Sequence, residues 1–214
     1  MSNRLSICYK GGSGSVVEKK SEFIADIIPV HTEEEAEAFI ETVRKKYYDA
    51  RHHCYAYVLS SGIKKQSDDG EPSQTAGKPM LDILDNENIT DICAVVTRYF
   101  GGTLLGTGGL VRAYSAALKE GLKSCVIVEK YSGSEHEYEI DYDLYGKIQH
   151  LAEGSDIYIT ACDFTEKINI KILTETNNSD SMLQMITELS GGKAKLIEIT
   201  RKEYIIIDGK VVVL

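Results

Sequence analysis

Three segments decide the fold: Ser67-Asp68-Asp69-Gly70-Glu71-Pro72-Ser73-Gln74-Thr75-Ala76-Gly77-Lys78-Pro79, then Thr97-Arg98-Tyr99-Phe100-Gly101-Gly102, and then Gly106-Thr107-Gly108-Gly109-Leu110-Val111-Arg112. Five of the 18 glycines lie between Gly101 and Gly109. Glycine adopts positive φ values at little cost and lets another backbone or a ligand approach closely. Because two arginines bracket this cluster, we look for the functional site here.

The glycine cluster separates a predicted strand from a predicted helix. Residues 92–97 form a near-continuous apolar run, the pattern of a strand that is covered on both faces. Beyond the glycines, apolar residues recur from Leu110 to Leu122 at helical spacing. Another helix is expected to begin near Gly77 and to run to about Leu84, since Pro79 is tolerated only in a first turn.

The rest of the first half is predicted to consist mostly of strands. Thr32 and Glu35 form a capping box in front of an amphipathic helix. Sequence patterns predict strands at 5–9, 16–17, 23–28, 53–60, 64–67 and 125–128, with a glycine-rich loop at 11–15.

The second half begins after Ser132-Gly133-Ser134, which we interpret as a boundary between domains 1–131 and 132–214. Strict alternation from 135 to 142 predicts a half-buried strand. The patterns that follow predict a helix at 144–151, strands at 157–162 and 167–173, a helix at 182–189, a strand at 195–200 and a hairpin around Asp208-Gly209. The order β-α-β-β-α-β is that of a ferredoxin-like sandwich, so the fold class is α+β.

Composition and charge restrict the class of protein. The hydrophobic fraction is 43%, and no run reaches the roughly 18 apolar residues of a membrane span. The first residues lack the apolar core of a signal peptide, so we expect a cytoplasmic protein with no membrane partner. The five cysteines are widely spread with no Cys-x-x-Cys pair, which favours reduced thiols.

The net charge of -9 is concentrated in the second half. Residues 1–131 carry 16 Lys and Arg against 18 Asp and Glu, whereas residues 132–214 carry 8 against 15. An acidic protein has no general attraction to phosphate backbones. Any contact with nucleic acid is therefore expected on a local basic patch in the first half.

The strand–glycine–helix junction is a candidate anion site. A helix that opens at Gly108-Gly109 presents free N–H groups and the positive end of its dipole. The candidate binding residues are Lys78, Arg98, Gly101, Gly102, Gly108, Gly109 and Arg112. The spacing fits neither a Walker A loop nor the dinucleotide fingerprint, so no cofactor is expected. In the alternative interpretation the glycines permit a tight turn and the arginines pair with nearby carboxylates.

Those carboxylates, Asp68, Asp69 and Glu71, form a second candidate site. Clustered carboxylates can hold a hard cation or act as acid and base. Asp-Gly and Glu-Pro are also ordinary turn sequences, and this interpretation is favoured. We therefore assign no catalytic residue and no metal.

Two further groups of residues contain side chains that could bind a ligand or react. His52-His53-Cys54 places a thiol beside imidazoles, but neighbouring strand residues point to opposite faces and no further Cys or His completes a metal site. Aromatic residues close to the arginines suit single-stranded nucleic acid, although at strand spacing they are more often core. They are Tyr55, Tyr57, Tyr99, Phe100 and Tyr114.

Taken together, the quoted motifs resemble the IMPACT family and its bacterial, two-domain, YigZ-like branch. The matching pieces are Ser67–Ser73, Thr75–Pro79, Arg98–Gly102, Leu105-Gly106, Gly108–Leu110 and Arg112–Tyr114. The similarity spans essentially the whole chain. One departure is Thr103-Leu104, where family members often carry a lysine, so the cationic surface here has one charge fewer.

The resemblance implies a first domain like the second domain of a small-subunit ribosomal protein, a fold shared with elongation factor G. It implies a second domain like the last, ferredoxin-like domain of that factor. It also implies a link to translation, because eukaryotic relatives inhibit a stress-responsive kinase of an initiation factor by competing for its activator. Some relatives are labelled proline dipeptidases, but this chain shows no dinuclear metal-ligand set.

The function expected from the sequence is a non-catalytic, translation-associated regulator or stress-response factor. It would bind RNA, the ribosome or a translation protein through the Gly/Arg-lined anion site of its first domain. The alternatives are a hydrolase or peptidase that uses Asp68, Asp69 or Glu71, and a purely protein-binding regulator.

Overall fold

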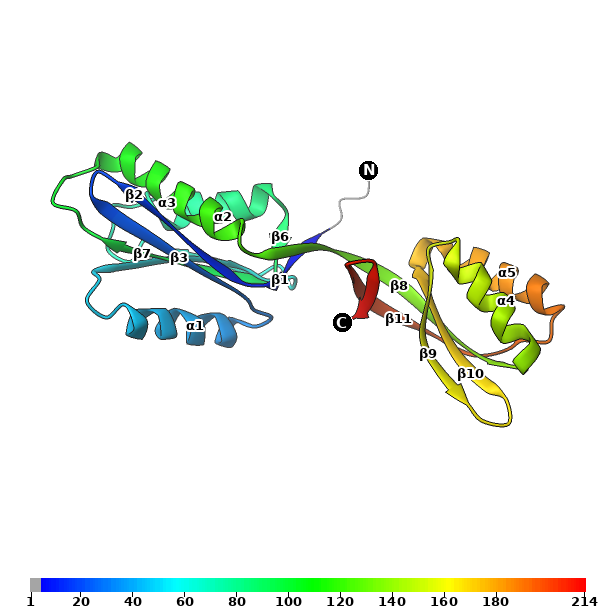
Figure 1. Ribbon diagram of the computed structural model, residues 1–214. Coiled ribbons are helices and arrows are strands. Elements are labelled where there is room, and N and C mark those ends of the chain that lie inside the picture. The colour runs from blue at the N-terminus through cyan, green and yellow to red at the C-terminus, as the bar shows by residue number, and fades with distance from the viewer. Residues whose placement is uncertain (1–4) are drawn as a thin grey trace. The chain divides into compact units, whose positions relative to one another are not determined.

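The computed structural model describes residues 5–214, which form a mixed α+β protein of two compact units. The chain divides into these units between Glu129 and Lys130. Each unit has its own β-structure and its own hydrophobic core, as Figure 1 shows. The predicted α+β class is confirmed.

The first unit contains strands β1 to β7, the beginning of β8, and three helices. Its strands are β1 (Ser6–Lys10), β2 (Gly12–Glu18), β3 (Ser21–Pro29), β4 (His52–Val58), β5 (Lys64–Ser67), β6 (Ile89–Thr90) and β7 (Ile92–Tyr99). Its helices are α1 (Glu33–Lys46), α2 (Gly77–Asn86) and α3 (Gly106–Leu122).

An antiparallel sheet in the order β2-β3-β7-β4-β5 forms the centre of this unit. Helices α2 and α3 pack on one face and α1 packs on the other (Figure 1). The central strand β7 is fully buried from Ile92 to Val96, which confirms that it is covered on both sides. Outside this sheet, β1 pairs with β6 and with the start of β8.

The predicted loop at 11–15 is wrong, because Gly12 begins β2 and pairs with Ile27 of β3. These glycines lie in the strand because α3 passes close to it. A Cβ on Gly12 would overlap Ser124, and a Cβ on Gly14 would lie 2.6 Å from the backbone nitrogen of Gly121. Glycine at these positions lets the end of α3 and the residues after it approach the strand closely, and it does not mark a turn.

The second unit contains most of β8 and the remaining elements. They are β8 (Val126–Ile140), α4 (Tyr142–Glu153), β9 (Ile157–Phe164), β10 (Ile168–Glu175), the short 3-10 helix η1 (Thr176–Asn178), α5 (Ser179–Ser190), β11 (Lys195–Ile207) and β12 (Lys210–Val213). The strands pair in the order β9-β10-β8-β11, with β12 added as a hairpin. The predicted order of elements, β-α-β-β-α-β, is therefore present.

Ser132-Gly133-Ser134 is not a connecting loop. All three residues lie in the middle of β8, where Gly133 pairs with Glu175 of β10 and Lys202 of β11. A Cβ on Gly133 would lie 2.7 Å from Leu173 Cδ1 and 2.9 Å from the Thr174 oxygen, so tight packing requires glycine at this position. The two predicted strands at 125–128 and 135–142 are one continuous strand.

His136 of β8 should make the stability of the second unit depend on pH. Its ring is fully buried, with Nε2 2.8 Å from Ser179 Oγ, and burial lowers the pKa of His136 while Asp180 partly opposes this shift. In the unfolded chain the ring takes up a proton near pH 6.5. Stability should therefore fall as the pH drops from about 6.5 toward the folded pKa, by at most about 1.4 kcal/mol per pH unit.

Urea unfolding between pH 7.5 and 5 measures this dependence. The variant His136→Asn should lose the pH-dependent part, whereas His150→Gln should keep it, since the His150 side chain is 90% exposed. Equal pH profiles for the wild type and His136→Asn would contradict the assignment.

Candidate anion-binding pocket

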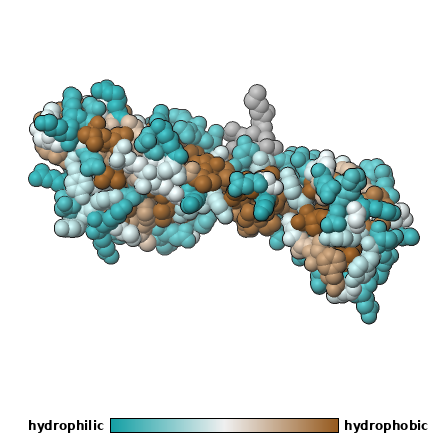
Figure 2. Space-filling view, viewed as in Figure 1, coloured by the Kyte–Doolittle hydropathy of each residue, from teal (hydrophilic) through white to brown (hydrophobic). Residues whose placement is uncertain are grey.

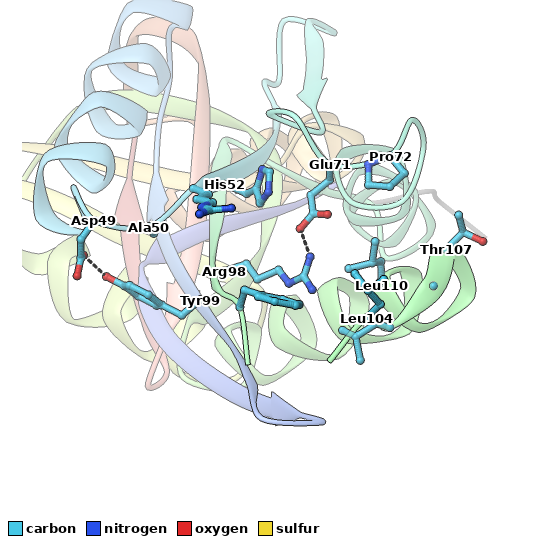
Figure 3. Close-up of a pocket in the computed structure, with 14 residues that line it drawn as sticks. Asp49, Ala50, His52, Glu71, Pro72, Arg98, Tyr99, Leu104, Thr107 and Leu110 are labelled. Atoms are coloured by element: carbon cyan, nitrogen blue, oxygen red, sulfur yellow. Dashed lines mark hydrogen bonds and ion pairs between the residues drawn. The ribbon is translucent and has the colours of Figure 1, made fainter. Parts of the chain in front are cut away.

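A cavity of about 830 Å³ opens in the first unit at the glycine cluster. It is lined by residues 49–52 between α1 and β4, 71–72, 98–100 at the end of β7, 104–107, and Leu110 of α3. Figure 3 shows these side chains converging from four separate parts of the chain. The predicted strand–glycine–helix junction therefore forms one wall of a real pocket.

A buried ion pair lies at the inner end of this pocket. Glu71 Oε1 accepts hydrogen bonds from Arg98 Nη1 at 2.7 Å and from Tyr114 Oη at 2.8 Å. The side chains of Arg98 and Glu71 are only 8% and 3% exposed (Figure 3). Burial raises the pKa of Tyr114, which keeps its hydroxyl protonated as a donor. Arg98 is thus neutralised by Glu71, as the alternative interpretation proposed.

Arg98 is also held by aromatic rings. Its guanidinium carbon lies 5.4 Å from the ring centre of Phe23 and 5.6 Å from that of Phe100, both within cation–π range. Its buried Nε has no hydrogen-bond partner among the described residues. A buried donor without a partner is costly, and each such group in a native protein calls for an explanation.

The three clustered carboxylates do not face one another as a site. Asp68 accepts hydrogen bonds from the backbone N–H groups of Gln74, Ala76 and Gly77 at 2.7–2.9 Å and so fixes the start of α2. Asp69 accepts from the His53 N–H at 2.7 Å. With Glu71 bound to Arg98, all three carboxylates serve the fold. No cluster able to hold a metal occurs within residues 5–214.

The His-His-Cys segment divides between surface and core. His52 lines the pocket, and its Nδ1 donates to the Asp69 carbonyl at 2.8 Å. His53 Nε2 donates to the Tyr47 carbonyl at 3.1 Å. Cys54 is fully buried and donates to the Asp68 carbonyl, and burial raises its pKa, so its thiol is unreactive.

The glycines of the cluster have different physical roles. A Cβ on Gly101 would overlap the backbone of Lys20, while Gly102 and Gly106 have positive φ values of 83° and 69°. Helix α3 begins at Gly106, two residues before the predicted Gly108-Gly109 opening, and no side chain caps it. Gly108 and Gly109 lie in its first turn. The free N–H groups of that turn adjoin the pocket through Gly106 and Thr107.

Two of the predicted cations lie outside the pocket lining. Lys78 pairs with Asp82 on the surface of α2. Arg112 is exposed on α3, with Nη1 lying 3.7 Å from the position a Cβ would take on Gly108. The sequence reasoning missed Arg51, an exposed cation that lines the pocket. No local sequence pattern points to Arg51, because it reaches the pocket through the pairing of His52 with Arg98, which brings the start of β4 to the end of β7.

The five aromatic residues also divide. Phe100 lines the pocket with 55% of its surface exposed, and Tyr99 lines it with its hydroxyl donating to Asp49 at 2.7 Å. That hydrogen bond raises the pKa of Tyr99 to about 12. Tyr55 and Tyr57 stack on each other at 6.3 Å beside the α1 core, and Tyr114 is buried. Phe100 is the most exposed of these five aromatic residues at the pocket.

Comparison with known proteins identifies the family. Residues 19–122 match the Impact N-terminal domain, and residues 139–193 match a domain of unknown function, DUF1949. The chain is 38% identical over 191 residues to the IMPACT family member YvyE of Bacillus subtilis, and the alignment covers 88% of each protein. The chain belongs to the IMPACT family. The resemblance inferred from the motifs is confirmed.

Further relatives and a solved structure are also similar to this chain. YigZ of Escherichia coli is 36% identical over 191 residues, covering 86% of this chain and 94% of YigZ. A crystal structure of a hypothetical protein is 32% identical and has a TM-score of 0.58, covering 94% of this chain and 99% of its own. A Dictyostelium discoideum IMPACT homolog is 42% identical over 98 residues, which is 43% of this chain and 28% of that protein.

In this IMPACT protein the whole pocket falls within the Impact N-terminal match, since its lining runs from Asp49 to Leu110. Across residues 5–214, no helix has the length and apolar character needed to cross a membrane. On the face drawn in Figure 2, hydrophilic side chains are spread over each unit, and hydrophobic patches lie among these side chains.

Proposed function

We propose that this protein is a non-catalytic, translation-associated regulator or stress-response factor of the cytoplasm that binds single-stranded RNA, free or in the ribosome. The pocket of the first unit is the proposed binding site. The observation that carries the proposal is the uncapped, glycine-rich start of α3, which adjoins a pocket that Arg51 also lines. A helix N-terminus beside a cation is suited to phosphate.

The pocket lining favours RNA over a general anion. Phe100 supplies an exposed aromatic face, and Arg51 supplies a guanidinium for which no partner occurs among residues 5–214. An aromatic platform combined with cations is the usual surface for single strands. The net charge of -9 opposes general attraction to RNA, so binding would depend on this local site.

The link to translation rests on the family, whose eukaryotic members are expected to act on translation. The likeness of the two units to a ribosomal-protein domain and to domains of elongation factor G belongs to the same proposal. A peptidase or hydrolase role is less supported, because Asp68, Asp69 and Glu71 are already hydrogen-bonded within the fold.

RNA affinity should fall steeply with salt and should depend on exposed cations near α3. Each lost phosphate contact lowers the slope of log affinity against log salt by about 0.7 for single strands. We expect Arg51→Glu and Arg112→Glu each to reduce that slope and to weaken binding at every salt concentration. Fluorescence anisotropy with a labelled single-stranded RNA measures both quantities.

Arg201→Glu is the matched control, since it makes the same charge change on an exposed residue of β11 in the second unit. Sedimentation of the tagged protein in a lysate gradient, with and without nuclease, tests the ribosome link. Salt-independent binding, or equal loss in all three variants, would overturn the RNA proposal. Recovery of one non-ribosomal protein regardless of nuclease would favour a protein-binding regulator instead.

A further inference from the structure

The pocket is too large and too apolar for a phosphate group alone. Its volume of about 830 Å³ lies in the range of small-molecule sites, and Leu104, Leu105 and Leu110 line it together with Phe100. We infer that the pocket holds one unstacked nucleotide, with its base on Phe100 and its phosphate at the start of α3. This inference rests on the proposed RNA-binding function and names the unit that the site recognises.

Phe100 and Leu104 supply the platform for the base. The Arg98 guanidinium lies over the Phe100 ring at 5.6 Å, which fixes the ring, and 55% of the Phe100 surface remains exposed. Leu104 is 84% exposed at the same pocket. Covering exposed apolar surface with a flat ring removes it from water, and this burial favours binding. Stacking on an aromatic side chain accepts any base, because every base has a π-face.

The start of α3 supplies the phosphate site. This helix is 17 residues long and has no side-chain cap, and Gly106 and Thr107 bring its first turn to the pocket. Glycine at 106 and 108 leaves these N–H groups unshielded by side chains; a Cβ on Gly106 would have no neighbour within 4 Å.

Arg98 forms part of the wall of the same pocket. Only 8% of its surface is exposed, and its Nε has no hydrogen-bond partner among the described residues. Glu71 satisfies only Nη1. Because this Nε is itself buried, Arg98 serves the site by holding the Phe100 ring and not by bonding a ligand. Arg51 supplies the open positive charge that Arg98, neutralised by Glu71, does not.

Calorimetric titration of the full chain with three probes tests the inference. Adenosine 5′-monophosphate should bind at least about tenfold more tightly than adenosine or inorganic phosphate alone, because base and phosphate contacts combine. Phe100→Ala should weaken nucleotide binding about tenfold, as expected for one lost stacking contact. Leu104→Ala should weaken it by a smaller factor, and its high exposure makes it a variant that folds normally.

Phe164→Ala is the matched control, since Phe164 is a 54% exposed aromatic of β9 in the second unit. Nucleotide affinity no greater than that for phosphate, or equal loss in Phe164→Ala, would overturn the inference. Salt-dependent RNA binding that Phe100→Ala leaves intact would overturn it and leave the proposed function standing. Nucleotide binding without RNA binding would support the pocket assignment and overturn the proposed function.

Discussion

Arg98→Met is expected to lower the free energy of unfolding of the first unit by about 3–5 kcal/mol, because it leaves the Glu71 carboxylate buried without its cation. Tyr114 still donates one hydrogen bond to Glu71, but a neutral donor does not compensate the charge. Denaturation in guanidinium chloride, monitored on amide signals of β7, measures the loss.

Two further variants separate loss of the pair from loss of volume. In Arg98→Met/Glu71→Gln no unpaired charge is buried, so much of the lost stability should return. Arg112→Met removes the same kind of charge from an exposed position and should change stability by no more than about 0.5 kcal/mol. If Arg98→Met changed the free energy of unfolding as little as Arg112→Met does, the Arg98–Glu71 pair would contribute little to stability.

Gly101→Ala should destabilise the first unit by about 3 kcal/mol, the upper end of the usual cost of overpacking, because its Cβ would overlap backbone atoms of Lys20. The overlap is with the β2–β3 turn, which cannot move aside as a flexible side chain would. Ser21, the first residue of β3, also anchors Gly101, whose N–H donates to Ser21 Oγ at 3.0 Å. Thermal unfolding of the variant measures the cost.

Gly102→Ala is the neighbouring control. Its Cβ would meet nothing within 4 Å, and only the positive φ of 83° opposes the substitution. The cost should therefore be about 1–2 kcal/mol, that of a left-handed conformation. A larger loss in Gly102→Ala than in Gly101→Ala would show that backbone conformation, and not the close approach of Lys20, explains this glycine pair.

The elements that local patterns determine were predictable from the sequence. The apolar run of β7, the Thr32 cap of α1 and the Asp208-Gly209 hairpin all appear where expected, and both hairpin residues have positive φ. The Glu35 carboxylate accepts from the His31 N–H, one residue before the cap, so the return bond of the predicted capping box is displaced by one residue. Glycine was the main source of error. Gly12 and Gly133 signal a turn in sequence, but each lies in a strand because another element packs directly against it.

Of the seven predicted binding residues, only Arg98 lines the pocket, and whether the pocket binds an anion stays a prediction. The strand–glycine–helix junction does line the pocket, and pairing of Arg98 with a nearby carboxylate was one of the two interpretations weighed. The identity of the carboxylate that pairs with Arg98 depends on long-range packing, and no local sequence pattern specifies that packing. The same holds for Arg51, which joins the pocket only through the pairing of β4 with β7.

Strand β8 has a consequence for how such proteins are built from modules. The two family matches end at residue 122 and begin again at residue 139, so most of β8 belongs to neither. Yet its first residues pair with β1, and its later residues pair with β10 and β11. A gene fusion that joined the modules at the edges of those matches would deprive both of a strand. A recombination event that preserves the fold of either unit must therefore include the residues of β8 that pair within that unit.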